Sequence, residues 1–81
     1  MASNKLFIMG ILVGRRQENS PLVQGVLSGF GERILMRAGV PSPDRQKGLI
    51  TLVLEGDEGD VADLAKKLEG IGDISVRTMS F

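Results

Sequence analysis

An unbroken apolar stretch near the start of the chain constrains the fold more than any other feature. Residues 6–13 read LFIMGILV, with no polar side chain between Lys5 and Gly14. Side chains along a strand point alternately to the two faces of its sheet, so a strand with one solvent-exposed face alternates apolar and polar residues. This stretch does not alternate, and its length and its Phe, Ile and Val residues favour a strand over a helix. We therefore predict a strand over residues 5–13 with both faces covered.

A second stretch, residues 49–54 (LITLVL), has the same two-sided character and predicts another central strand over residues 48–55. Weaker strands are predicted over residues 34–38 and 74–79, and the latter alternates as an edge strand does. Residues 39–47 (GVPSPDRQK) should form the hairpin connection between the second and third strands. Their two prolines lack the backbone N–H that a strand ladder needs, so we expect the second strand to end before them.

The first of two predicted helices follows a polar, glycine-led loop over residues 14–19. Ser20 is a typical N-cap, and Pro21 suits the first helical position because its missing N–H costs nothing there. We expect this helix to run to about Phe30. Gly25 inside it suggests close packing against a neighbouring backbone. The apolar stripe at helical spacing consists of Leu22, Val23, Val26, Leu27 and Phe30.

The second predicted helix has the clearest signals in the chain. Asp57 is a typical N-cap, and acidic residues in the first turn favour the positive end of the helix dipole. Gly70 marks the end of this helix. Apolar residues recur at positions i, i+3, i+4 and i+7, namely Val61, Leu64, Ala65 and Leu68.

The order strand, helix, strand, strand, helix, strand is that of the ferredoxin-like βαββαβ plait. We predict one α+β domain over residues 1–81, with an antiparallel sheet and both helices on one of its faces. This plait places its first and third strands in the middle of the sheet, which agrees with the two-sided apolar runs found there.

Composition excludes several function classes. The chain has no Cys and no His, so thiolate metal sites and the commonest general base are absent, and we expect neither enzyme activity nor a cofactor. Ten basic residues balance ten acidic ones, whereas nucleic-acid modules usually carry a basic excess, so direct nucleic-acid binding is not expected. An apolar run of eight residues is far shorter than the roughly 20 that cross a bilayer, so we expect a cytoplasmic protein without membrane attachment.

Four acidic residues are the one group with the chemistry of a hard metal site: Asp57, Glu58, Asp60 and Asp63. Their spacing lacks the calcium-loop pattern, and helix capping explains the first three. We predict no metal site.

Both helices of the predicted plait cover the same sheet face, yet the central strands are apolar on both. Monomers seldom expose apolar patches larger than a few hundred Å². We therefore expect a homo-oligomer, a dimer or larger; a monomer with an open apolar face is the alternative.

Three segments make the chain similar to a known family. They are residues 34–41 (ILMRAGVP), 52–54 (LVL) and 67–78 (KLEGIGDISVRT), and the likeness extends over roughly residues 5–79. The chain resembles the small stand-alone proteins described as regulators of the iron-only hydrogenase system, which share an ACT-like or nickel-regulator-C-terminal-like plait. The resemblance implies an oligomer with a regulatory task linked to hydrogenase genes or maturation. Without His or Cys the chain cannot form the nickel site of the nickel-sensing branch, and residues 1–4 are too few for a DNA-binding arm, so regulation should act through a ligand or a partner protein.

The best candidate ligand site is the end of the first strand and the segment after it: Gly14, Arg15, Arg16, Asn19 and Ser20. A glycine lets a ligand approach the backbone, and a helix N-terminus offers N–H groups to an anion or a carboxylate. Two arginines could hold an anion in bidentate fashion. The resemblance to ACT-type sensors implies that this corner, completed by a neighbouring chain, binds an amino acid or another small anionic ligand. A plain surface loop before a capped helix is the alternative.

Two functional hypotheses follow. The leading one is a non-enzymatic, oligomeric regulatory module that senses a small molecule at its protomer interface. The alternative is a structural interaction module that docks on a hydrogenase-related protein partner and binds no metabolite.

Overall fold

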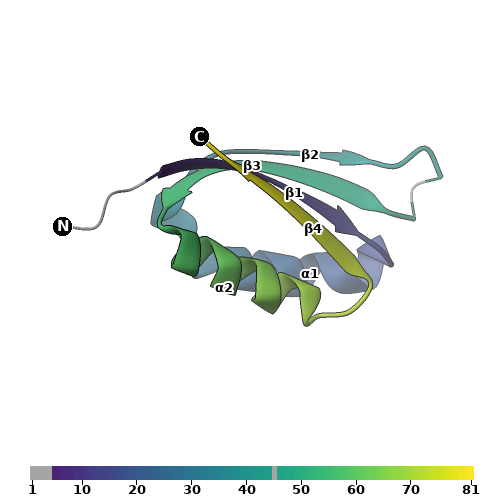
Figure 1. Cartoon of the computed structure of the whole chain (residues 1–81). Helices are drawn as coiled ribbons and strands as arrows, with labels where there is room; N and C mark the ends of the chain where they lie inside the picture. The colour runs from purple at the N-terminus through teal and green to yellow at the C-terminus, as the bar shows by residue number, and fades with distance from the viewer. Residues whose placement is uncertain (1–4, 45) are drawn as a thin grey trace.

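Across residues 5–44 and 46–81, which the computed structural model describes, four strands form one antiparallel sheet with two α-helices on one face (Figure 1). The elements follow in the order β1 (Lys5–Val13), α1 (Arg16–Ser28), the short 3₁₀ helix η1 (Gly31–Arg33), β2 (Ile34–Pro41), β3 (Gly48–Gly56), α2 (Glu58–Glu69) and β4 (Ile74–Ser80). Residues 1–4 and Arg45 of the predicted hairpin connection lie outside the described residues. None of the described helices is long and apolar enough to cross a membrane.

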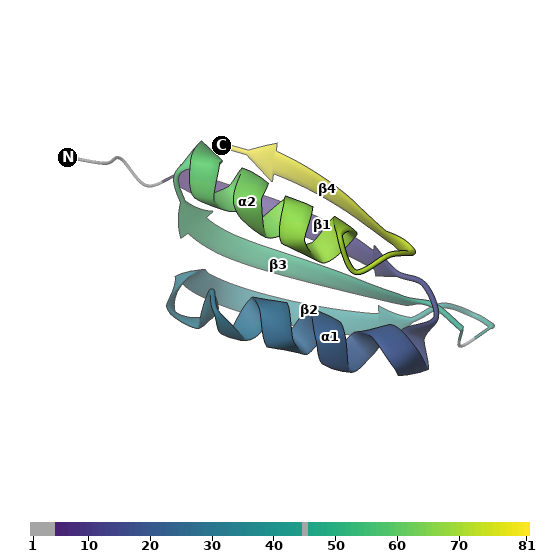
Figure 2. The ribbon, with the colours of Figure 1, turned by 90° about the horizontal axis from the view of Figure 1, so that it is seen from below.

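The sheet has the strand order β2-β3-β1-β4, and every neighbouring pair is antiparallel. This arrangement confirms the predicted ferredoxin-like α+β plait, with the two-sided apolar strands β1 and β3 in the middle. Figure 2 shows α1 on the β2 side of the sheet and α2 on the β1–β4 side, while the β2–β3 hairpin extends past the helices.

Successive side chains of β1 point alternately to the face of the sheet that carries the helices and to the opposite face. Those facing the helices are buried, as are their β3 partners Leu52 and Leu54, and together with side chains of both helices they form the core, against which the partner Ile50 is partly buried. Burying each of these side chains contributes about 1.5–3 kcal/mol. The buried apolar residues are Phe7, Met9, Ile11, Val13, Val23, Leu27, Leu52, Leu54, Val61, Leu64, Leu68 and Ile74.

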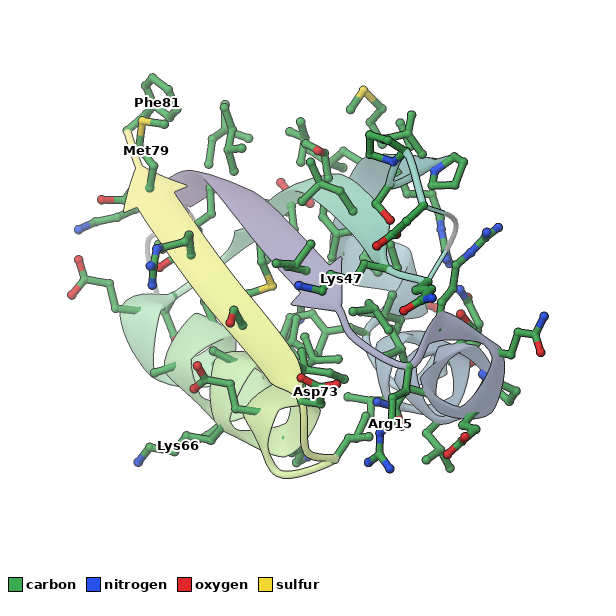
Figure 3. The ribbon with its side chains drawn as sticks, turned by 90° about the vertical axis from the view of Figure 1, so that its right-hand side faces the viewer. Arg15, Lys47, Lys66, Asp73, Met79 and Phe81 are labelled. Carbon is green, nitrogen blue, oxygen red and sulfur yellow. The ribbon has the colours of Figure 1, made fainter. Side chains whose placement is uncertain are left out.

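The opposite face of the sheet, here called the open face, carries apolar side chains that no element within residues 5–44 and 46–81 covers. Strand register places on it Leu6, Ile8, Leu12, Met36, Val40, Leu49, Val53 and Met79. Six of these eight are at least 39% exposed. Figure 3 shows Met79 and Phe81 pointing away from the helices.

The first helix differs from the prediction at its start. α1 begins at Arg16, so Pro21 lies inside the helix and Ser20 is not its N-cap. Sequence signals favoured Ser20 and Pro21, but tertiary contacts of residues 14–19 decide the start, as described below. Leu22 is 54% exposed and does not belong to the buried stripe. Gly25 faces open space with no packing neighbour, so the predicted close backbone approach there is wrong.

The second strand continues three residues past its predicted end, because Gly39, Val40 and Pro41 pair with β3. β2 is an edge strand, and a proline is tolerated at an edge, where a missing donor removes no central ladder bond. In the hairpin loop the Ser42 hydroxyl and the Gln46 N–H both donate to the Asp44 carboxylate. These two hydrogen bonds, that of Ser42 first, hold the pKa of Asp44 below its ordinary value.

The second helix follows its sequence signals. The Asp57 carboxylate accepts a hydrogen bond from the Asp60 N–H at 2.8 Å, which confirms Asp57 as N-cap, and Gly70 is the C-cap.

Candidate functional site

Four segments meet at the predicted site corner: the end of β1, the start of α1, the β2–β3 loop and the α2–β4 turn. The Gly14 N–H donates to the Asp73 carbonyl at 2.8 Å, and the Arg16 N–H donates to the Gln46 carbonyl at 3.0 Å. Figure 3 shows Arg15 and Asp73 at this end of the molecule. The backbone donors of Gly14 and Arg16 are therefore engaged with carbonyls of the same chain.

Gly14 is buried, and its open side is filled by Asp73. A Cβ atom placed on Gly14 would overlap the carboxylate of Asp73. Glycine at this position thus accommodates a side chain of the α2–β4 turn.

Asn19 is 3% exposed and is the one buried polar residue in the described chain. Its side-chain Nδ2 donates to the Gly14 carbonyl at 2.8 Å and to the Gly72 carbonyl at 3.1 Å. The turn that it holds contains two positive backbone angles, φ 100° at Gly72 and φ 59° at Asp73. Asn19 therefore ties α1, the end of β1 and the α2–β4 turn together.

Arg15 adopts a left-handed backbone conformation, with φ 45°, immediately before α1. Its side chain is 60% exposed, at 3.7 Å from the Glu18 carboxylate and 3.9 Å from that of Asp73. Exposed ion pairs of this kind contribute little to stability. A surface hollow of about 350 Å³ at this corner is lined by Arg15, Arg16, Gln17, Glu18 and Gln46.

Arg16 and Ser20 also line a second depression, here called the α1–β2 groove, of about 230 Å³. Its floor includes Gly39, Gly48 and Ile50. The stem of Arg16 lies across Gly48, where a Cβ atom would be 3.4 Å from its Cδ. The complete lining is Val13, Arg16, Ser20, Gln24, Arg37, Ala38, Gly39, Val40, Pro41, Gly48, Leu49 and Ile50.

A second arginine of the groove comes from β2. Arg37 donates from Nη2 to the Gln24 Oε1 at 2.7 Å, so a neutral side chain of α1 holds its guanidinium group. The lining contains Arg16 and Arg37 but no carboxylate. An arrangement of two guanidinium groups, a hydroxyl and an amide is suited to bind an anion.

Three acidic residues at the start of α2 make structural contacts within the chain. Asp57 caps the helix, Glu58 pairs with Lys5 at 2.9 Å, and Asp60 pairs with Arg33 at 2.5 Å. Within residues 5–44 and 46–81, no three carboxylates come together as a metal site would require.

The structure thus divides the five predicted site residues into two groups. Gly14 and Asn19 are buried and bonded to each other, whereas Arg15, Arg16 and Ser20 reach the surface. Sequence reasoning missed Gln24 and Arg37, which complete the α1–β2 groove. Only the strand register places Arg37 on the helix side of β2, because its partner Leu52 points toward the helices.

Comparison with known proteins gives the family. The sequence profile of the TM1266-like family matches residues 5–78, and its description reads "Iron-only hydrogenase system regulator, putative". The chain belongs to this family. The predicted resemblance is thereby confirmed over nearly the whole chain, and the family description places the chain among regulators.

Two solved structures support the fold of this TM1266-like chain. The uncharacterized protein TM1266 from Thermotoga maritima superimposes with a TM-score of 0.90 at 30% identity, covering 98% of this chain and 99% of its own. A functionally unknown protein from Pediococcus pentosaceus ATCC 25745 gives a TM-score of 0.64 at 9% identity, covering 99% and 94%, and shows the same fold. No curated protein matches the chain.

Proposed function

We propose that this TM1266-like chain is a non-enzymatic regulatory module that works as a homo-oligomer and responds to a small anionic ligand at its β1–α1 corner. The observation that carries the proposal is the open face, an apolar sheet surface that lies opposite both helices. Apolar surface of this kind gains free energy when it leaves water, at about 25 cal/mol per Å².

The charges on the open face favour a second copy of the chain as its occupant. Along the described strands, the charged residues of this face are Arg77 in register with Gly10, and Glu55 in register with Leu6. Two copies facing each other would therefore bring equal numbers of cations and carboxylates together. The whole chain has a net charge of zero, so copies do not repel one another over distance.

A ligand regulates such a module by binding two assembly states unequally, because only a difference in affinity shifts an equilibrium. A corner in which four segments meet is a suitable place for this, since a ligand there contacts several elements at once. The ligand and its coupling to assembly are parts of the proposal.

The second candidate function is a protein interaction module that binds no metabolite. One observation favours it: the backbone donors of Gly14 and Arg16 are already bonded within the chain. In this case the open face would bind a hydrogenase-related protein.

A matched pair of substitutions tests the assembly. Leu12→Lys places a charge on the central strand β1 of the open face, and Leu22→Lys places the same charge on α1, where the leucine is likewise exposed. Analytical ultracentrifugation should find an oligomer for the parent chain and for Leu22→Lys, and a folded monomer for Leu12→Lys. A monomeric parent chain, or equal assembly of both variants, would contradict the proposal.

Thermal unfolding at one fixed protein concentration separates the two candidate functions. A panel of amino acids and small anions should raise the unfolding temperature, because a ligand at 100 times its dissociation constant adds about 2.7 kcal/mol. For a domain of this size, each kcal/mol corresponds to roughly 4–8 °C. A flat panel with intact assembly would favour the interaction module.

A further inference from the structure

We infer that the α1–β2 groove binds one small dianion, a phosphoryl group or a dicarboxylate, between Arg16 and Arg37. The inference names the ligand class and the place of binding, and it rests on the proposed function for the regulatory role of that ligand. Binding of an anion in the groove follows from the residues that line it.

The charge of the groove favours an anion as its ligand. Its lining holds two arginines and no carboxylate, although the chain contains as many acids as bases. In the described part of the chain, carboxylates pair with Lys5, Arg15 and Arg33, but not with Arg16 or Arg37. These two guanidinium groups therefore keep their capacity to bind an anion.

Neutral neighbours contact both arginines, and one of them holds Arg37 by a hydrogen bond. The Gln24 amide oxygen accepts one N–H of Arg37, which leaves the remaining donors of that guanidinium group for a ligand. The stem of Arg16 lies on Gly48, where the absence of a side chain makes room for it. Preorganised donors lose less conformational entropy when a ligand binds, so such an arrangement favours affinity.

The volume of the groove is sufficient for a small dianion. A water molecule occupies about 30 Å³ of liquid, so the 230 Å³ of the groove correspond to about eight waters. Inorganic phosphate and succinate are both within this size. Gly39 has no side chain and therefore leaves space in the groove. A Cβ atom added there would lie 3.8 Å from the Leu49 carbonyl and 3.9 Å from Ile50.

Isothermal titration of the full chain with inorganic phosphate and with succinate tests the inference, and uncharged succinamide is the matched control ligand. We expect one binding site per chain for at least one anion and none for succinamide. Binding of phosphate alone would assign a phosphoryl ligand, and binding of succinate alone a dicarboxylate.

Five variants test the location of the site. Arg16→Gln and Arg37→Gln should each weaken binding by about tenfold or more, because each removes a charged hydrogen-bond donor. Arg33→Gln, at an arginine that lies outside the groove and pairs with Asp60, should leave the affinity unchanged. Gly39→Leu should abolish binding by filling the groove while both arginines remain, and Gly39→Ala provides a folding control.

The oligomeric state of the same samples keeps the two proposals distinguishable. An assembled chain that binds neither anion contradicts the groove and leaves the assembly standing. A monomeric chain whose anion binding depends on Arg16 and Arg37 contradicts the proposed assembly and supports the groove. Equal weakening by Arg33→Gln and Arg16→Gln would overturn the assignment of the site.

Discussion

The helices α1 and α2 both follow a strand of the sheet, but the two corners are built in different ways. At the β3–α2 corner, the Asp57 side chain caps the helix from within the same short segment. At the β1–α1 corner, Arg15 provides no side-chain cap, and the chain is held instead by contacts to the hairpin loop and the α2–β4 turn. One corner depends on a local contact and the other on distant ones. Substitutions should therefore disturb α2 locally and the α1 corner across several elements.

The largest effect is expected for Asn19→Ala. This change leaves the Gly14 and Gly72 carbonyls without the Nδ2 donor that they share, and losing such buried partners costs about 2–3 kcal/mol. Urea unfolding at fixed protein concentration measures the loss. The exposed Gln17→Ala variant of the same helix is the control, and an equal effect of both variants would show that the corner does not depend on Asn19.

A smaller effect is expected for Gly14→Ala, whose methyl group would overlap the Asp73 carboxylate and displace it. Overpacking of this kind costs about 1–3 kcal/mol. Asp73→Gly removes the carboxylate and also relieves the positive φ at that position. In a double-mutant cycle by urea unfolding, Gly14→Ala should be nearly neutral in the Asp73→Gly background. Simple additivity of the two changes would contradict the contact.

The corner of α2 should respond less. Asp57→Ala removes one capping hydrogen bond and should cost about 1 kcal/mol. Hydrogen exchange should show faster opening only in the first turn of α2. Because the two corners do not share this contact, the costs of Asp57→Ala and Asn19→Ala should add; a coupling between them would mean that the α2 cap is not local.

The smallest effect is expected from lowering the pH, which protonates Asp44 and weakens its hydrogen bonds. The folded chain lowers the pKa of Asp44 through hydrogen bonds from Ser42 and Gln46, so their stabilisation is present above the ordinary pKa of this carboxyl and is lost as the pH falls through the lowered value. Gln46 also accepts the Arg16 N–H. We therefore expect the protection of the Arg16 amide, which compares its exchange rate with the intrinsic rate at the same pH, to fall in acid. NMR titration should find a lowered pKa for Asp44 that rises in Ser42→Ala, and an unchanged value in this variant would exclude the Ser42 hydroxyl as the main cause.

Apolar patterning by itself determined the fold. The runs at residues 6–13 and 49–54 required two central strands, and the alternation of side chains along a strand put apolar residues on both faces of the sheet. The cap and the periodicity of α2 were equally readable, because each involves residues within one turn of each other.

The tertiary structure decided what depends on distant residues. Sequence alone placed the start of α1 at Pro21, because Ser20 and Pro21 carry good local signals, whereas carbonyls of Gln46, Gly72 and Asp73 accept hydrogen bonds from residues 14–19 and hold the chain so that the helix begins at Arg16.

The predicted site was affected for the same reason. Of its five residues, Gly14 and Asn19 hold the corner together, while Arg16 and Arg37 both line a groove between α1 and β2. Residues 21 positions apart in the chain show no common pattern in the sequence; only the packing of a helix against an edge strand brings them to the same groove.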